Sequence, residues 1–312
     1  MITVRPYTSD DITQWDAFID RGKNATFLFK RGFMEYHANR FTDHSLMLFE
    51  EDRLVALLPA SRDAEGTLVS HGGLTYGGMV TQASMTVALA LPLFEALLAR
   101  ARNDRFVRLH YQPVPYIYHR LPADEDLHAL FLCGAQLVRS DVSSTIALRN
   151  FKGFSKSKRA GVKAAAKAGI VVAESRDFDA FWGMLAQTLD SRHSARPTHS
   201  LDELDLLASR FPVQIRLFLA LLNNEPCAGI IVFDCGPTVH TQYIASTPKG
   251  REVGAADAIV AKLLHQVYAD REWFDFGIST VNQGRDLNVG LSRQKEMYGA
   301  RTTVYQHYLI TL

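Results

Sequence analysis

The stretch at residues 246–264 reads STPKGREVGAADAIVAKLL and joins an apolar, strand-like run to a helix. Gly250 and Gly254 stand in the connection, just before the alanine-rich start of the helix. The first amide groups of a helix have no partner within it and carry partial positive charge, and glycines leave room for a ligand to approach them. The stretch therefore predicts an anion site suited to a pyrophosphate.

Composition sets wide limits on the protein. A length of 312 residues exceeds the usual size of one domain, so two domains are expected. A net charge of +1 provides no overall field that would recruit nucleic acid or membrane, and only a local patch could do so. The three cysteines lie far apart or in apolar runs, which favours buried thiols in a reducing compartment. With no signal-peptide pattern and no long apolar span, we expect a cytoplasmic protein without membrane insertion.

Hydrophobic periodicity predicts the same order of elements twice. Each half reads β, α, α, β, β, β, α, β, α, β, which indicates a duplicated α/β fold with mixed sheets. We place the two domains at residues 1–148 and 149–312. The helices are expected at about 9–21, 30–40, 84–103, 124–133, 177–190, 201–210, 254–270 and 286–298.

This order, together with the pattern of Arg251, Gly254 and Ala256 (RxxGxA), resembles the GNAT acyltransferase fold in tandem. Doubled GNAT folds are typical of Fem-type transferases and a related acetyltransferase-like group. In GNAT proteins the pattern holds the pyrophosphate of coenzyme A, whereas Fem-type proteins need no coenzyme A, so the intact pattern favours acyl-CoA. The alternative is an ordinary connection into a core helix. The resemblance implies an acyl-CoA loop made of Lys249, Gly250, Arg251, Val253, Gly254 and Ala255.

A basic segment, FSKSKRAGVKAAAKAG, occupies residues 154–169. Seven basic residues and no acidic residue lie between positions 142 and 173. Such a helix suits a phosphate-bearing substrate, with Arg159 and Lys163 as the contacting residues; the alternative is a solvated face. Four of the basic residues share one helical stripe: Lys156, Arg159, Lys163 and Lys167.

The loop DSRHSARPTHS at residues 190–200 connects two predicted helices. In GNAT folds this connection lies over the acceptor site, so the resemblance makes His193, Arg196 and His199 acceptor-binding candidates. Histidine, with an ordinary pKa of about 6.5, is suited to take a proton from an amine. Tyr243 is a further substrate-binding candidate. The alternative is that the loop only caps the next helix and that its histidines are exposed.

The segment FDFGISTVNQGRDLNVGLSRQKEMYG, residues 274–299, resembles the Fem-type ending, in which a DFG-type strand precedes a lysine before an aromatic–glycine pair. That resemblance implies that Lys295 faces a cleft and binds phosphate or stabilises developing negative charge. Asp275, Ser279 and Asn288 supply hydrogen-bonding groups near the expected ligand edge of the sheet. A surface pair between Lys295 and Glu296 is the alternative, but adjacent helical residues do not face each other.

The first half contains a glycine-rich loop, HGGLTYGGMV, at residues 71–80. It has no basic residue, so a second coenzyme site is not expected, and Tyr76 is retained as a substrate-lining candidate. The sequence contains no GxSxG, HExxH or CxxC pattern, so we expect no metal.

These features favour a tandem-GNAT acyltransferase that moves an acetyl or other acyl group from acyl-CoA to an amine. The amine could belong to an amino sugar, including a nucleotide-linked sugar, or to an amino acid of envelope polysaccharide. His199 or His193 would act as the base, and Lys295 would stabilise the oxyanion. A Fem-type transferase that uses aminoacyl-tRNA is the runner-up; the basic stripe favours it, and the lack of a long charged helical arm weighs against it. A catalytically silent GNAT-like binding module is the third hypothesis.

Overall fold

The computed structural model describes residues 1–190 and 197–312, without the side chains of 188–190. The chain forms two compact units, Met1–Val142 with Thr280–Asp286 and Val304–Leu312, and Ser143–Ser279 with Leu287–Thr303. The predicted ranges 1–148 and 149–312 did not include this return of the chain to the first unit. It occurs because the last strand pairs antiparallel with a strand of the first unit, Tyr308 lying opposite Tyr111.

The first unit has two sets of strands. Strands β1, β3, β4 and β7 form one sheet, and β17, β8, β6, β5 and β2 are neighbours in the other. Helix α3 buries Leu93, Phe94 and Leu97 in the core of this unit. The bounds are β1 (Ile2–Pro6), α1 (Ile12–Arg21), α2 (Arg31–Met34), β2 (Thr42–Asp43), β3 (Leu46–Glu50), β4 (Arg53–Leu58), β5 (Ser61–Arg62), β6 (Thr67–Ser70), β7 (Val80–Thr81), α3 (Val87–Asn103), β8 (Arg108–Tyr111), α4 (Glu125–Leu132), β9 (Gln136–Ala147), β15 (Thr280–Val281) and β17 (Arg301–Thr311).

The second unit is built on strands in the order β10, β11, β12, β13, β14 and the end of β9. All neighbouring pairs are antiparallel except β13 with β14. The bounds are α5 (Lys156–Lys167), β10 (Val171–Ser175), α6 (Phe178–Asp190), α7 (Leu201–Arg210), β11 (Ile215–Leu222), β12 (Glu225–Asp234), β13 (Thr238–Ser246), α8 (Pro248–Glu252), α9 (Ala255–Lys262), β14 (Trp273–Ile278), β16 (Asp286–Leu287) and α10 (Val289–Glu296).

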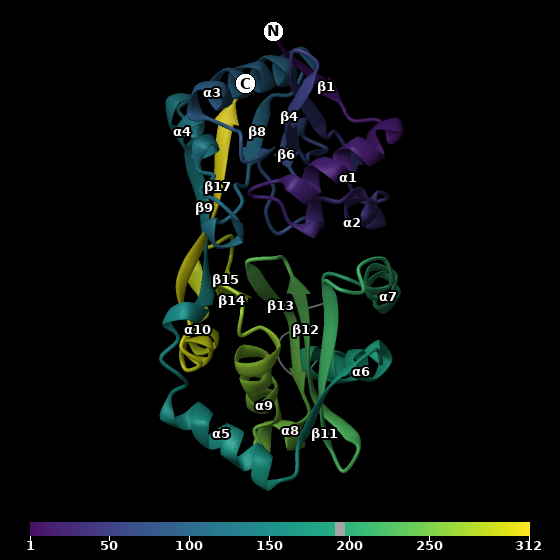
Figure 1. Cartoon of the computed structure of the whole chain (residues 1–312), viewed down its shortest axis with the longest axis vertical. Coiled ribbons are helices and arrows are strands. Elements are labelled where there is room, and N and C mark those ends of the chain that lie inside the picture. The colour runs from purple at the N-terminus through teal and green to yellow at the C-terminus, as the bar shows by residue number, and fades with distance from the viewer. Residues whose placement is uncertain (191–196) are drawn as a thin grey trace. The chain divides into compact units, whose positions relative to one another are not determined.

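Helices cover both faces of the sheet in the second unit (Figure 1). Along β12, Ile230 and Val232 pack into the core that includes Ile259 of α9. Gly229, one residue away, lies against Phe181 of α6, and a Cβ there would collide with that ring. Because successive strand residues point to opposite faces, α9 and α6 lie on opposite sides of this sheet.

The predicted fold class is confirmed, and the predicted helices and longer strands occur in the predicted order. The short strands β2, β7, β15 and β16 and helix α8 were not predicted. Local sequence accounts for several boundaries. Helix α7 begins with the capping box of Ser200 and Glu203, whose side chains each bond the other's backbone amide. The predicted helix over 254–270 is shorter: α9 ends at Lys262 and continues as one π-helical turn over Leu263–Val267. None of the helices in the described residues has the length and apolarity required to cross a bilayer.

Candidate active site

The parallel strands β13 and β14 pair over a short distance and then separate. Thr238–His240 pair with Trp273–Asp275, while β13 continues to Ser246. A register shift in the pairing of β12 with β13 bends the strand before its last residues. Beyond His240, the end of β13 therefore opens onto a pocket that its last three residues help to line.

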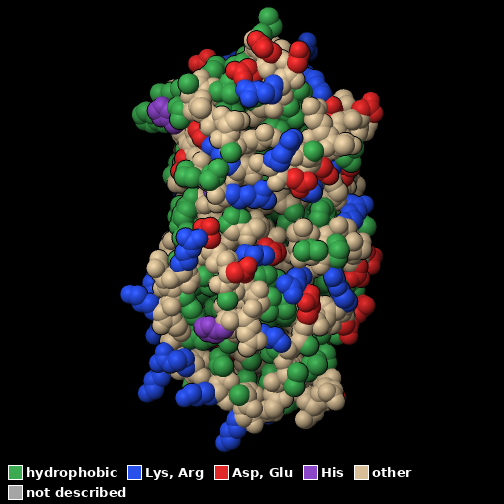
Figure 2. Space-filling model, in the orientation of Figure 1, with side chains coloured by type: hydrophobic (Ala, Val, Ile, Leu, Met, Phe, Trp, Pro, Cys, Tyr) green, Lys and Arg blue, Asp and Glu red, His purple; other side chains and the backbone are tan. Residues whose placement is uncertain are grey.

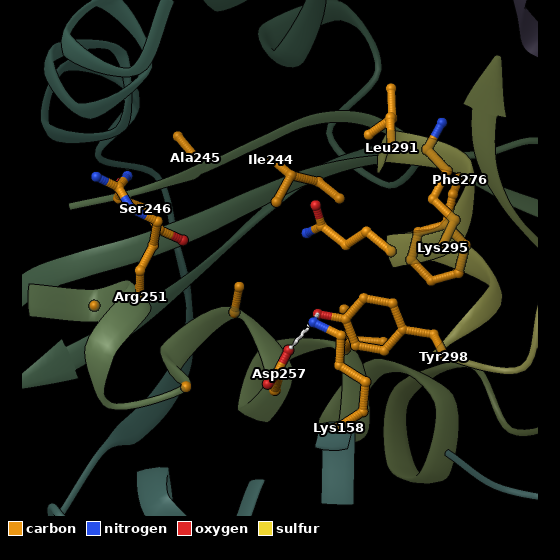
Figure 3. A pocket seen from close by; sticks show the side chains of 15 residues that line it. Lys158, Ile244, Ala245, Ser246, Arg251, Asp257, Phe276, Leu291, Lys295 and Tyr298 are labelled. Atoms are coloured by element: carbon orange, nitrogen blue, oxygen red, sulfur yellow. Dashed lines mark hydrogen bonds and ion pairs between the residues drawn. The ribbon is translucent and has the colours of Figure 1, made fainter. Parts of the chain in front are cut away.

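The pocket has a volume of about 380 Å³ and lies within the second unit (Figure 3). Its lining comes from α5, β13, α8, α9, β14 and the segment around α10. It contains three cationic side chains and one carboxylate, a composition that favours a ligand with oxygen acceptors. The lining residues are Lys158, Ile244, Ala245, Ser246, Gly250, Arg251, Gly254, Ala256, Asp257, Val260, Phe276, Leu291, Gln294, Lys295 and Tyr298.

The carboxylate belongs to Asp257, in the first turn of α9. It accepts a hydrogen bond from Lys158 Nζ at 2.8 Å and another from the hydroxyl of Tyr298. Figure 3 shows the Lys158 ammonium directed at this carboxylate. Lys158 also lies 4.2 Å from the centre of the Tyr298 ring. A negative side chain in the first turn complements the positive end of the helix, so the chain itself supplies the anion at this position.

Helix α5 lies directly against the start of α9. Gly254, which precedes α9, has a φ of +74°, and a Cβ there would collide with the backbone of Gly161 in α5. A Cβ on Gly161 would in turn collide with the Asp257 carboxylate. Two glycines therefore permit a contact between backbones that no larger residue would allow. This contact places α5 against one side of the N-terminus of α9, where Gly254, Ala256 and Asp257 also line the pocket.

Four amides of the predicted coenzyme loop, those of Gly250, Arg251, Val253 and Gly254, donate within the chain. The connection folds into α8, whose N-cap Thr247 accepts from Gly250 N at 3.0 Å. The amides of Arg251, Val253 and Gly254 donate to carbonyls three or four residues earlier. The Arg251 side chain donates to Ser246 O at 2.5 Å. Asp257 places a carboxylate at the start of α9, which disfavours a pyrophosphate there, whereas Gly250, Arg251, Gly254 and Ala256 of the same connection line the pocket. The coenzyme role remains a prediction.

Lys295 lies on α10 and is 6% exposed. Its Nζ donates to the consecutive carbonyls of Gly277 and Ile278, at 2.7 and 2.8 Å. Burial lowers the pKa of Lys295 to about 8, and the negative charge of Asp275 opposes this shift. Two of the three donors of an ammonium are thereby used, and the side chain also lines the pocket.

Asp275 is fully buried behind the pocket. Its oxygens accept from Ser143 Oγ (2.7 Å), Thr145 Oγ1 (2.8 Å) and Gly277 N (3.2 Å), and one bonds His240 Nδ1 at 2.8 Å. Burial alone would raise its pKa, but the hydrogen bond and charge of His240, followed by the two hydroxyl donors, lower it to about 2. Asp275 was predicted to contact substrate, but its position is that of a group that holds other residues.

His199 is 7% exposed and precedes α7. Its Nδ1 lies 2.7 Å from the hydroxyl of Tyr243 on β13, which also accepts from the His199 amide at 3.2 Å. Burial raises the pKa of Tyr243, so its hydroxyl keeps its proton at neutral pH. The structure therefore brings two predicted site residues together. His193 and Arg196 lie outside the described residues.

The other predicted residues are distributed over several positions. Asn288 caps α10, its side chain accepting from Leu291 N at 3.0 Å. Ser279 is buried, and its hydroxyl has no hydrogen-bond partner in the part of the chain that the structure describes. Arg159 and Lys163 are exposed on α5, and Tyr76 is buried in the first unit. Within the described ranges, no cluster of metal-ligating side chains occurs.

Sequence reasoning missed three members of the site, Lys158, Asp257 and His240. Lys158 is one of the seven basic residues of the segment, but it does not belong to the stripe of four. Its side chain points into the pocket, and no separate role was predicted for it. Asp257 follows directly after the RxxGxA pattern, where a carboxylate would oppose a bound pyrophosphate. The position of Asp257 could therefore have been recognised from the sequence as unfavourable for a pyrophosphate.

Comparisons with known proteins agree with this fold. Residues 152–283 match the family model described as an acetyltransferase (GNAT) domain. The structure of FemX superposes with a TM-score of 0.70 at 13% identity, covering 99% of this chain and 97% of FemX. L-PGS from Bacillus licheniformis gives 0.61 at 14% identity, covering 97% and 90%. A tandem GNAT protein from the clavulanic acid biosynthesis pathway gives 0.54 at 11% identity, covering 100% and 98%.

At these identities the structural likeness concerns the fold. It confirms the predicted tandem-GNAT architecture across the whole chain. Among curated proteins, no significant match to the sequence was found.

Proposed function

We propose, starting from the GNAT acetyltransferase domain at residues 152–283, that this chain transfers an aminoacyl group from an RNA-linked donor to an amine acceptor. This was the runner-up in the sequence analysis. A GNAT domain implies an acyl donor as co-substrate, and the structure bears on which kind of donor can bind. An amine of an amino sugar or amino acid of the cell envelope remains the proposed acceptor.

The start of α9 is the observation that carries this choice. Helix α5 packs against it at Gly161, and its first turn carries the carboxylate of Asp257, which is already held by Lys158 and Tyr298. A pyrophosphate placed there would meet a negative charge and a helix backbone. An aminoacyl ester of RNA needs no pyrophosphate site, because the RNA contains no pyrophosphate and its phosphodiesters can bind to another surface of the protein. The pocket itself is large enough for an amino-acid side chain and its ester.

In the proposed reaction, the nitrogen of the acceptor amine attacks the ester carbonyl in the pocket. The carbonyl oxygen becomes an oxyanion, which Lys295 can stabilise from its fixed position beside Gly277. The C–N bond forms, the C–O ester bond breaks, and the RNA hydroxyl leaves with a proton. The amine loses a proton to solvent or to a base. His199, paired with Tyr243, is the predicted base, and it is not among the residues that line the pocket.

The outer face of α5 supports a polyanionic carrier. Within the described residues, none of its four stripe residues forms an ion pair, and all four are exposed: Lys156, Arg159, Lys163 and Lys167. Figure 2 shows Lys and Arg side chains gathered over α5. Between these cations the exposed residues are small, Ser157 and Ala160 among them, and not the large apolar ones that a membrane-surface helix requires.

The first experiment compares the two donors. Calorimetry with acetyl-CoA is expected to show no binding, whereas a filter assay with aminoacyl-tRNA is expected to show saturable binding. Transfer is then measured by moving a labelled amino acid from tRNA to a panel of amines. Micromolar binding of acetyl-CoA that is lost in Arg251→Ala but retained in Lys249→Ala, an exposed residue paired with Glu252, would restore the acyl-CoA hypothesis.

A second prediction concerns the basic face of α5. Changing all four stripe residues to Gln should weaken RNA binding and reduce the slope of log affinity against log salt by about 3, since each phosphate contact contributes about 0.7–0.9. A matched control changes four exposed arginines of the first unit to Gln, and its slope should not change. An unaltered slope in the α5 variant would contradict this prediction. The control residues are Arg53, Arg102, Arg105 and Arg108.

A further inference from the structure

The carbonyl groups that hold Lys295 come from a turn within β14. Gly277 has a φ of +74°, a conformation that favours glycine. At this point the pairing of β14 with β9 shifts register between Asp275 and Ile278. The shift directs the carbonyls of Gly277 and Ile278 at the same ammonium. The position of Lys295 Nζ therefore depends on the shape of this turn.

Asp275 fixes the turn from behind. Its Oδ2 accepts from the Gly277 amide and contacts His240 Nδ1, so one oxygen joins the turn to β13. Its Oδ1 accepts from Ser143 and Thr145, which joins the turn to β9. A carboxylate with no exposed surface and this many donors has one orientation.

His240 packs against the same turn. A Cβ on Gly277 would come within 3.1 Å of His240 Cε1, so the imidazole ring lies on the face of the glycine. The register of the parallel strands brings His240 opposite Asp275. The side chain of His240 is 13% exposed and that of Asp275 is fully buried, so their contact lies largely out of solvent.

We propose that Asp275 and His240 are positioning residues that fix the Gly277 turn and thereby the place and charge of the Lys295 ammonium. The proposal rests on the proposed role of Lys295 in transfer. Asp275 and His240 would thus affect the reaction through Lys295, without touching the substrate.

The electrostatic environment of Lys295 makes the proposal testable. Burial lowers the pKa of Lys295 to about 8, and the negative charge of Asp275 acts in the opposite direction by favouring the ammonium form. The other charged groups that line the pocket are Lys158, Asp257 and Arg251, of which Lys158 and Asp257 are paired with each other. The phenol of Tyr298 keeps its proton, because burial and the charge of Asp257 raise its pKa. Loss of the Asp275 charge should therefore lower the pKa of Lys295 further.

The experiment is competitive labelling of lysines with trace acetic anhydride over a series of pH values, read by mass spectrometry of the Lys295 peptide. In Asp275→Asn, the midpoint of labelling should fall by about one pH unit. Unfolding would instead move it up toward about 10.4, so the direction separates an electrostatic effect from simple loss of structure. The control, Asp270→Asn at an exposed position, should keep the native midpoint. An unchanged midpoint in a folded Asp275→Asn protein overturns the proposal.

Two variants at His240 test the second residue. His240→Gln can still donate to Asp275 and should keep native amide hydrogen exchange over residues 274–280. His240→Leu cannot donate, and exchange over this segment should become at least about tenfold faster, since loss of a bond to a buried charged group costs about 1.5–3 kcal/mol. Equal exchange in both variants and the native protein would remove His240 from the proposal. Neither readout needs donor or acceptor, so a failure here is distinct from a failure of the proposed transfer activity.

Discussion

Replacement of Lys295 by methionine is expected to lower the rate of transfer by about 10²–10³-fold, the usual effect of removing one donor that stabilises an oxyanion. Methionine has a similar length, so the pocket should keep its shape and donor binding should change little. The loss should therefore appear in kcat and not in the dissociation constant of the donor. The measurement is single-turnover transfer from labelled aminoacyl-tRNA, with Arg293→Met, an exposed neighbour on α10, as the matched control.

The same lysine predicts the pH dependence of the reaction. Only the ammonium form can stabilise an oxyanion, and burial lowers the pKa of Lys295 to about 8. Transfer should therefore be retained below this pH and be lost as the pH rises through it, provided that the amine acceptor is not limiting. A rate that stays constant up to pH 10, or a Lys295→Met protein with native turnover, would exclude a catalytic ammonium at this position.

A large loss of stability is expected when the contact between α5 and α9 is disturbed. Gly254→Ala should lower the free energy of unfolding by about 3 kcal/mol, combining about 1–2 kcal/mol for a side chain at positive φ with about 1–3 kcal/mol for overpacking. The collision is with the backbone of Gly161, which cannot rotate away as a flexible side chain could. Urea denaturation of the purified variant gives this quantity directly.

Gly183 provides the control for that substitution. It lies within α6, and a Cβ there would meet no heavy atom within 4 Å. Gly183→Ala should therefore stabilise the protein by up to about 1 kcal/mol, because alanine is the better helix former. If Gly254→Ala were as stable as Gly183→Ala, α5 would not lie against the start of α9 in solution.

Much of the fold could be predicted because it depends on local patterns. The capping box at Ser200, the amphipathic periodicity of the helices and the repeated element order all lie within short windows of sequence. The basic stripe was predicted on one helix, and α5 carries it. Lys295 was found through the resemblance to Fem-type sequences, which identified the residue but not the carbonyl groups that hold it.

The rest of the site depends on pairs that are distant in sequence. Lys158 and Asp257 are separated by 99 residues, Tyr298 and Asp257 by 41, and His240 and Asp275 by 35. No local periodicity encodes such pairs, because they form only when the sheet brings its strands together. Helix α8 was also missed. Thr247 and Pro248 favour a helix start, but the RxxGxA pattern predicted an open loop at the same residues.

The backbone contact between Gly161 and Gly254 also bears on how donor preference could change during evolution. Point mutation of Asp257 would remove a charge but leave the main chain of α5 where it is. Under the proposed function, the path of α5 and not one side chain limits which donor this chain accepts, and a change of donor class would require the segment leading into the second unit to take another path. Chimeras that exchange this whole segment, and not libraries of single substitutions, are the variants in which such a change of donor should be sought.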